Sequence, residues 1–138
     1  MSIKEIRKKP VNEEWVPLVD EKENVTEEAP RSKVHDGSKL LHPVVHMHVF
    51  NSKGAILLQK RPESKLIQLG KWDTAVGGHI SAGETFEEAL KKEAWEEIGL
   101  KDFPAKLHKI YKWESDVEAE VVYLFTTSGI KNFHVHSI

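Results

Sequence analysis

The sequence predicts a single mixed α/β domain, and three observations lead to that fold class. A central segment, residues 85–99, carries the start and stop signals of an α-helix. Strand-like segments joined by turn residues lie on both sides of it, which is typical of a mixed α/β fold rather than a helical bundle. The chain has 138 residues, enough for one continuous core and too few for two ordinary domains, so we expect one domain over residues 1–138.

The polar N-terminal part, residues 1–43, is expected to form an edge strand and loops. Residues 15–19 are mostly apolar and favour a short edge strand. The acidic stretch at residues 20–28 is interpreted as a loop. The core is then expected to occupy residues 44–138.

Two β-hairpins are predicted within this core. In residues 44–50, β-branched and apolar residues alternate with histidines, and the turn residues 51–54 lead into a second apolar run at residues 55–60. Residues 107–115 and 120–127 form a second pair of strand-like segments around a short turn. Both hairpins favour antiparallel pairing of neighbouring strands.

Between the first hairpin and the helix, the sequence predicts a loop, a short strand and a break. The loop covers residues 61–71 and the strand covers residues 72–76. Gly77 and Gly78 are expected to end the regular structure because glycine allows backbone conformations that other residues avoid. The C-terminal residues 128–138 have no clear pattern.

The helix itself has capping residues at both ends. Thr85 is a good N-cap, and Glu88 three residues later completes a capping box. Gly99 stands where a left-handed residue usually ends a helix. We therefore expect a helix that starts after Thr85 and ends before Gly99.

Composition limits the classes of function. Hydrophobic residues make up 39% and charged residues 30%, as in soluble globular proteins. The net charge of -2 and the lack of a basic block argue against a nucleic acid polymer as partner. No cysteine is present, which excludes disulfides, zinc fingers and thiol nucleophiles. No run approaches the roughly 18 apolar residues of a membrane span, so we expect no membrane partner and a cytoplasmic location.

The helix carries carboxylates on the face expected to meet the core. At about 100° per residue, Glu93 and Glu97 project into the apolar stripe about 40° apart, and Glu96 lies at its edge, about 60° from Glu93. A Glu-rich helix usually just exposes a solvated face. On a partly buried face, however, like charges one turn apart persist only if protonated, paired with bases or neutralised by a cation. The stripe consists of Phe86, Ala89, Leu90, Ala94 and Ile98.

An oxygen-only cluster favours a hard cation, Mg²⁺ or Mn²⁺, and such ions usually bind substrate phosphates as well. Gly77, Gly78 and Gly83 flank a loop that ends in Glu84 and leads into the helix N-terminus. The free amides of a helix N-terminus attract anions. We therefore expect the helix and this loop to form one site for a small anionic substrate.

Residues 78–100 resemble the Nudix box, which reads Gly, five residues, Glu, seven residues, then Arg-Glu-aliphatic-any-Glu-Glu-any-Gly-aliphatic. The segment runs Gly-His-Ile-Ser-Ala-Gly-Glu, seven residues, then Lys-Glu-Ala-Trp-Glu-Glu-Ile-Gly-Leu. The resemblance implies the Nudix α/β/α sandwich with a mixed sheet, and hydrolysis of a diphosphate linkage in a small molecule. It also implies that Glu93, Glu96 and Glu97 bind the metal, that Glu93 sometimes serves as general base, and that Glu84 supports the loop.

Lys92 stands where the family has arginine. It keeps the positive charge but loses the planar fork that can orient a carboxylate through two hydrogen bonds. Lys92 is thus a tolerated variant, or it marks reduced activity or a differently supported base. With Glu93 and Glu97 it completes the candidate catalytic set.

A second set of residues resembles the metal ligands of isopentenyl-diphosphate isomerase, a Nudix-fold enzyme that does not hydrolyse its substrate. Three imidazoles and two carboxylates can complete a metal site. The isomerase needs a cysteine two residues before the third of these histidines, and this sequence has Gly77 there. The hydrolase interpretation is therefore preferred. The five residues are His35, His42, His79, Glu118 and Glu120.

Two alternatives stay open: a non-catalytic module that binds a diphosphate ligand, and an isomerase-like enzyme that uses a different acid. Family members usually continue with another strand and a helix that closes the sheet, so the C-terminal part is expected to be shortened at Ile138. A partner subunit, for example in a homodimer, would be one way to complete it. The group attached to the diphosphate is not fixed by the residues of the box.

Overall fold

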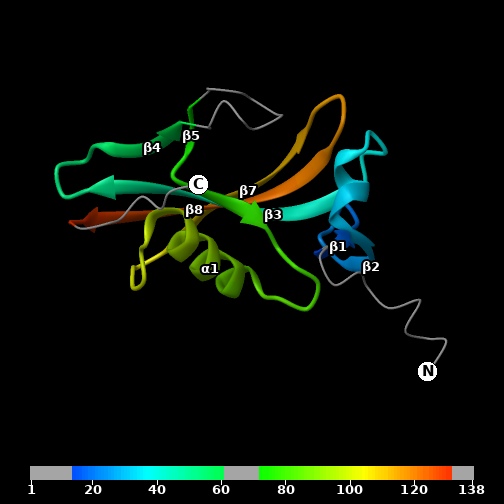
Figure 1. Ribbon diagram of the computed structural model, residues 1–138, viewed down its shortest axis with the longest axis horizontal. Coiled ribbons are helices and arrows are strands. Elements are labelled where there is room, and N and C mark those ends of the chain that lie inside the picture. Colours follow the sequence, from blue (N-terminus) through cyan, green and yellow to red (C-terminus); the bar gives the residue numbers. More distant parts are fainter. Residues whose placement is uncertain (1–13, 61–71, 132–138) are drawn as a thin grey trace.

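The computed structural model describes residues 14–60 and 72–131. In this part of the chain, one α-helix covers one face of a six-stranded sheet, and a separate two-stranded hairpin lies at one end (Figure 1). The mixed α/β fold class is confirmed, with one α-helical layer in the described ranges. The predicted loop at residues 61–71 and the end of the tail, from residue 132, lie outside them. Over the same ranges, no helix has the length and apolar character needed to cross a membrane.

The main sheet is mixed, and its long central strand β3 joins the two predicted hairpins, because it pairs with β4 on one side and with β8 on the other. The strand order is β5-β4-β3-β8-β7, and β6 pairs with β3. β3 runs parallel to β8, whereas its pairings with β4 and β6 are antiparallel. The strands are β3 (Leu41–Asn51), β4 (Ile56–Lys60), β5 (Trp72–Thr74), β6 (Val76–His79), β7 (Lys106–Glu114) and β8 (Ala119–Ile130).

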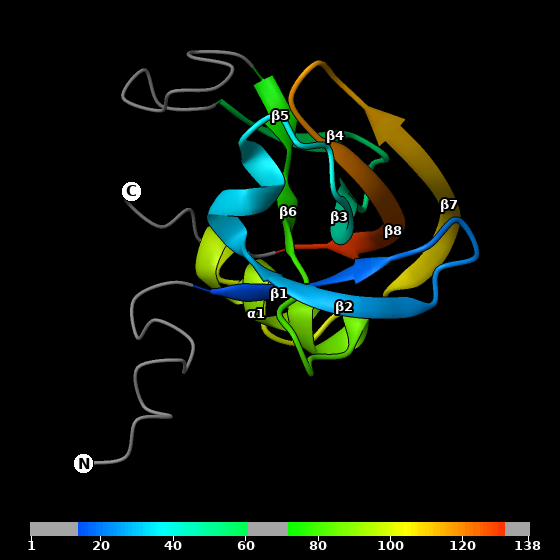
Figure 2. The same cartoon turned by 90° about the vertical axis from the view of Figure 1, so that its right-hand side faces the viewer.

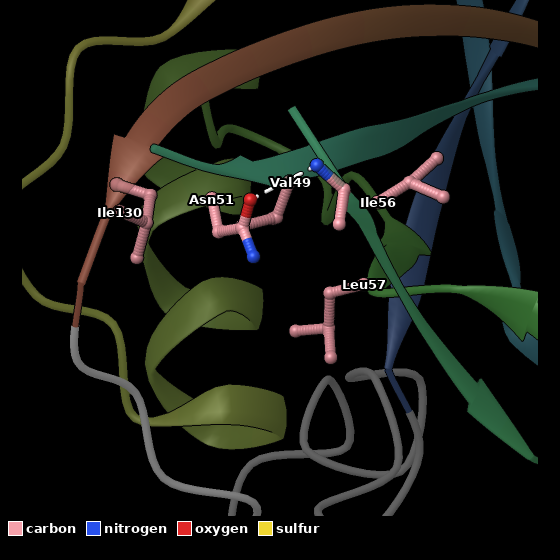
Figure 3. Close-up of a pocket in the computed structure, with 6 residues that line it drawn as sticks. Val49, Asn51, Ile56, Leu57 and Ile130 are labelled. Carbon is pink, nitrogen blue, oxygen red and sulfur yellow. Dashed lines mark hydrogen bonds between the residues drawn. The ribbon is translucent and has the colours of Figure 1, made fainter. Parts of the chain in front are cut away.

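Both predicted hairpins are confirmed. β3 and β4 pair through Val49 with Leu57, and β7 pairs antiparallel with β8. At the β3–β4 turn, the Oδ1 atom of Asn51 accepts hydrogen bonds from the N–H groups of Lys53 and Ala55, both at 2.9 Å. Figure 3 shows a small pocket of about 110 Å³ beside this turn, and none of the predicted site residues lines it. Its lining consists of Val49, Asn51, Ala55, Ile56, Leu57 and Ile130.

The predicted helix is confirmed as α1 (Phe86–Ile98) with both of its caps. The Thr85 hydroxyl accepts a hydrogen bond from the Glu88 N–H, and the Glu88 carboxylate accepts one from the Thr85 N–H. Gly99 ends the helix in the left-handed conformation, at φ 65°. These local bonds satisfy backbone groups that a helix end would otherwise leave unpaired.

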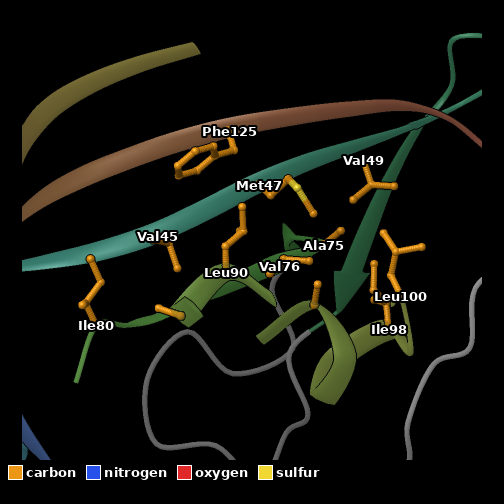
Figure 4. Close-up of a cluster of buried hydrophobic side chains, with 12 residues drawn as sticks. Val45, Met47, Val49, Ala75, Val76, Ile80, Leu90, Ile98, Leu100 and Phe125 are labelled. Atoms are coloured by element: carbon orange, nitrogen blue, oxygen red, sulfur yellow. The ribbon is translucent and has the colours of Figure 1, made fainter. Parts of the chain in front are cut away.

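The core lies between α1 and the sheet (Figure 4). Side chains alternate along a strand, so Val45, Met47 and Val49 of β3 point toward α1. Val44 packs instead with Val122 and Leu124 of β8 in a second cluster. The even-numbered residues of β3, which include three histidines, therefore lie on the face away from α1.

The prediction for the N-terminal part was partly wrong. The predicted strand is present as β1 (Trp15–Val19), and it pairs antiparallel with β2 (Val25–Pro30) in a separate two-stranded sheet (Figure 2). The acidic stretch was expected to be a loop, yet its second half enters β2. The turn is closed by Asp20, whose carboxylate accepts bonds from the Lys22 and Asn24 N–H groups. Pairing with β1 outweighs the low strand propensity of the acidic residues.

The chain then forms a short 3-10 helix, η2 (Arg31–His35), before it enters β3 at Leu41. The main sheet therefore starts three residues earlier than the expected boundary at residue 44. This short helix places His35 next to residues that come much later in the sequence.

Candidate active site

The two glycines before the helix lie inside a strand, which corrects the expectation that they end the regular structure. Gly77 and Gly78 belong to β6 and pair with His46 and Val45 of β3. The reason for glycine here is space rather than flexibility. A Cβ atom on Gly78 would lie 2.4 Å from Cδ of Glu93. The missing side chain of Gly78 thus makes room for the Glu93 carboxylate against the sheet.

We predict that Gly78→Ala displaces Glu93 and destabilises the protein by about 1 to 3 kcal/mol, as expected for overpacking. Gly77→Ala is the matched control, because its Cβ would meet only ordinary contacts, 3.4 Å from His46 Cδ2 at the closest. Denaturant unfolding of both variants measures the difference. Equal stability of the two variants would show that Glu93 does not need the space at Gly78.

Glu97, one turn after Glu93, is held by two hydrogen-bond donors. Its Oε1 atom accepts a bond of 2.6 Å from Nε2 of Gln59, and its Oε2 atom accepts one of 3.0 Å from the Gly77 N–H. Gln59 also donates to the carbonyl groups of Thr74 and Ala75. Gln59 was missed in the sequence, although a polar residue at an inward position of β4, next to inward Leu57, was a usable signal.

Burial raises the pKa of both inward carboxyl groups. For Glu93 the pKa reaches about 7, and repulsion from Glu97 and Glu96 adds to the effect of burial. Burial also raises the pKa of Glu97, although the bonds from Gly77 and Gln59 act in the opposite direction. Glu96 is exposed on the outer side of the helix, near enough to add its charge. A divalent cation beside Glu93 and Glu97 would relieve their repulsion. In the described part of the chain, however, the three glutamates of α1 do not form a group with all ligand atoms within 4.8 Å of one another, so their role as metal ligands stays a prediction.

The raised pKa of Glu93 makes the stability of the metal-free protein depend on pH. The pKa of Glu93 is about 7 in the folded state and lies above the ordinary value of 4.5. The contribution of this group to the free energy of unfolding is therefore fully present below about pH 4.5 and is lost as the pH rises through 7. We therefore expect that, in a chelator, Glu93→Gln melts at a higher temperature than the wild type, and that this difference is larger at pH 8 than at pH 5 by about 2 to 4 °C. Subtracting the melting temperature of the wild type from that of the variant at each pH removes the contribution of all other titrating groups. A constant difference across this range would contradict the assignment.

The loop before α1 is fixed by Glu84 and Lys92. The Glu84 Oε1 atom accepts a hydrogen bond of 2.9 Å from the Ser81 N–H, and its Oε2 atom lies 3.5 Å from Nζ of Lys92. Lys92 therefore acts on the loop carboxylate, as a support from the helix. Glu84 is thus bonded to the loop that precedes α1, and its part in the site stays a prediction.

The five residues of the second predicted set meet in one cluster. His35 bonds through Nδ1 to Glu118, and its Nε2 atom lies 3.0 Å from Nε2 of His79. The rings of His42 and His79 stack with centroids 5.4 Å apart, and His42 Nε2 lies 3.7 Å from Oε2 of Glu120. η2, β3, β6 and the β7–β8 hairpin each contribute to this cluster.

The cluster fits a metal ion because its imidazoles offer lone pairs to a cation. His42 is fully buried, and its Nδ1 atom lies 3.0 Å from the Leu40 carbonyl oxygen, so Nδ1 carries the proton and donates it. Nε2 of His42 then offers a lone pair and has no hydrogen-bond partner within the described residues. Burial, with nearby Arg31 and His42, lowers the pKa of His79 to about 3, which keeps it neutral. Ligand atoms of His42, His79 and Glu120 lie within 4.8 Å of one another.

The two candidate sites lie on opposite faces of β6. Gly78 pairs with Val45 on the side of α1, where Glu93 lies. His79 pairs with Val44 on the other side, where the histidine cluster lies. One glycine-containing strand therefore separates the carboxylates of α1 from the imidazoles.

The comparisons with known proteins agree with this fold and with the position of the box. The family model described as the NUDIX domain matches residues 40–134, more than half of the chain. An uncharacterized Nudix hydrolase of Yersinia pestis is 35% identical over 103 residues, which is 75% of this chain and 56% of the relative. An isopentenyl-diphosphate Delta-isomerase of Kocuria rhizophila is 37% identical over 87 residues, 63% of this chain and 48% of the relative.

A crystal structure of a Deinococcus radiodurans protein superposes with a TM-score of 0.73 at 22% identity, and the match covers 89% of this chain and 76% of that one. This likeness concerns the fold alone. The chain spans about half the length of the curated relatives it matches. Since the family model covers most of the main sheet and α1, and a relative above 30% identity spans three quarters of the chain, the chain belongs to the Nudix family.

Proposed function

We propose that the chain is a metal-dependent hydrolase that cleaves a diphosphate linkage in a small molecule of the nucleoside-diphosphate-X type. The observation that carries this proposal is the pair of half-buried carboxylates, Glu93 and Glu97, packed against the glycines of β6. A purely structural helix would place apolar side chains at these positions. The family membership supports the same reaction class.

In this proposal each residue of the site has a separate task. Glu97 is oriented by Gln59 and the Gly77 N–H, and with Glu93 and Glu96 it would hold Mg²⁺ or Mn²⁺. The cation supplies charge neutralisation for the diphosphate and activation of water. Glu93 accepts the proton as the water oxygen attacks phosphorus. The bond from phosphorus to the bridging oxygen breaks, and that oxygen leaves with the other fragment.

A second candidate function, an isomerase-like reaction on a diphosphate, is favoured by two observations. The histidine cluster assembles all five residues of the second predicted set, and a relative with substantial identity is named as such an isomerase. Gly77 offers no acid at the position where the isomerase uses a thiol, so proton transfer would need another group. For this reason hydrolysis is the first proposal.

A panel assay separates these functions and the purely binding alternative. The protein is incubated with Mg²⁺ or Mn²⁺ and a set of nucleotide sugars, dinucleotides, nucleoside triphosphates and prenyl diphosphates. The masses of the products are then measured by mass spectrometry. A hydrolase releases two phosphate-bearing fragments, or one fragment and phosphate. An isomerase gives a product of unchanged mass, and a binder only raises the melting temperature. Absence of fragments from every substrate would overturn the first proposal.

Two further proposals need separate measurements. We also propose a homodimer, and its mass can be measured by light scattering. A cytoplasmic location is proposed from the sequence alone, and fractionation of cells that produce the chain tests it.

A further inference from the structure

The N-terminal hairpin is attached to the loop of the Nudix box, although it lies before the residues that the family model matches. The Ala82 N–H donates a hydrogen bond of 2.8 Å to the carbonyl oxygen of Trp15. The Ser81 hydroxyl donates one to the carboxylate of Glu14. The residue that starts the hairpin and the middle of the loop are therefore joined by a side-chain bond and a neighbouring backbone bond.

Glu14 also contacts the residue that replaces the arginine of the box. Its Oε2 atom lies 3.9 Å from Nζ of Lys92, while the Glu84 Oε2 atom lies 3.5 Å from the same nitrogen. Its Oε1 atom lies 3.5 Å from Nη1 of Arg31, and its carbonyl oxygen accepts a 2.8 Å bond from the Arg31 N–H. Half-buried Lys92 thus lies between two carboxylates, one from the loop and one from the hairpin.

The chemistry of lysine explains why two carboxylates are needed. An arginine can bind one carboxylate through two parallel hydrogen bonds and so fix its direction. An ammonium group has three donors but no planar fork, so a single carboxylate leaves it free to turn. A second acceptor on another side of the ammonium restricts that motion.

We propose that Glu14 is a positioning residue that, together with Glu84, fixes Lys92 and the loop at residues 80–84 beside the carboxylates of α1. In this role Glu14 acts through its contacts with Lys92 and Ser81. Its negative charge also adds to the rise in the pKa of Glu93, an effect that does not depend on whether residue 92 is lysine or arginine. The effect on catalysis rests on the proposed function, but the effect on the loop does not. The dependence on Glu14 is specific to lysine at position 92, and arginine there reduces it.

The test is a double-mutant cycle of Glu14→Gln and Lys92→Arg in the full chain. The first readout is amide hydrogen exchange at Ser81 and Ala82. Glu14→Gln is expected to speed exchange at these amides about threefold to tenfold in the Lys92 background, and clearly less when residue 92 is arginine. Glu27→Gln, an exposed carboxylate on the same hairpin, is the matched control and leaves both amides unchanged.

The second readout is activity on whichever diphosphate the wild type cleaves, together with Mn²⁺ affinity. Glu14→Gln is expected to lower kcat about threefold to tenfold at temperatures well below unfolding, with KM little changed, and Lys92→Arg rescues most of this loss. A merely structural role would lower the melting temperature and speed exchange throughout the hairpin, without rescue by arginine. That pattern, or strictly additive effects, overturns the proposal.

The two proposals fail in different ways. If the wild type cleaves no diphosphate, the proposed function is wrong, and hydrogen exchange and Mn²⁺ affinity still decide the role of Glu14. If the wild type is active but Glu14→Gln does not change the rate of hydrogen exchange at Ser81 and Ala82, only the positioning role is wrong.

Discussion

Glu97→Gln is expected to abolish metal-dependent turnover while the fold is kept. Both carboxylate oxygens of Glu97 already accept hydrogen bonds, from Gln59 and from the Gly77 N–H, so the side chain is fixed in place. The amide removes the negative charge that a cation needs, and we expect a loss of at least about 100-fold in kcat/KM. It also has one oxygen instead of two, so one donor loses its acceptor at a cost of about 1 to 3 kcal/mol.

The control for this experiment is Glu87→Gln on the exposed side of the first turn of α1. It makes the same chemical change in the same helix and is expected to keep turnover close to that of the wild type. Circular dichroism and a melting curve show whether Glu97→Gln is folded under assay conditions. Undiminished turnover in folded Glu97→Gln would refute the proposed carboxylate site.

His42→Asn is expected to remove the metal affinity of the histidine cluster. The shorter amide nitrogen can still donate to the Leu40 carbonyl group, as Nδ1 of His42 does, but the buried Nε2 atom is lost. We expect binding of Mn²⁺ or Zn²⁺ at this site to weaken about 100-fold or more. Titration calorimetry and metal content after dialysis measure this change.

A chelator gives an independent measure of the same site. Metal bound to the folded state stabilises it, so the wild type should melt at a lower temperature in the chelator. His42→Asn should lose the part of this response that comes from the histidine cluster and keep the part that comes from a cation at the carboxylates of α1. His48→Asn, a half-buried histidine on the same strand, is the control and should respond like the wild type. Equal metal content in all three proteins would show that the cluster does not bind the ion.

Local signals predicted the helix and the hairpins. Thr85, Glu88 and Gly99 act within α1 or next to it, so their meaning is visible in a short stretch of sequence. The stripe of α1 could be derived from periodicity, because every helix of this length has the same geometry. The same periodicity placed Glu93 and Glu97 on this stripe, and both lie against the glycines of β6. The resemblance to the box added that these glutamates bind a metal, which stays a prediction.

Other features depend on pairing between distant residues. The strand β2 forms beside β1 although Glu27, Glu28 and Pro30 disfavour a strand, and only Val25 and Thr26 at its start favour one. The contact of Glu14 with Ser81 joins residues 67 positions apart, and no local pattern indicates it. Gly78 was expected to end the regular structure, but its role is set by a carboxylate from α1 that local reasoning cannot place.

The glycine pair of β6 has unequal freedom to change during evolution. At Gly78 any side chain would collide with Glu93, so that position is closed to substitution as long as the carboxylate site is used. At Gly77 a small side chain would find ordinary contacts beside His46 and Thr74. A single codon change at Gly77 could therefore introduce a small reactive side chain on one face of this strand and leave the carboxylates on the other face in place.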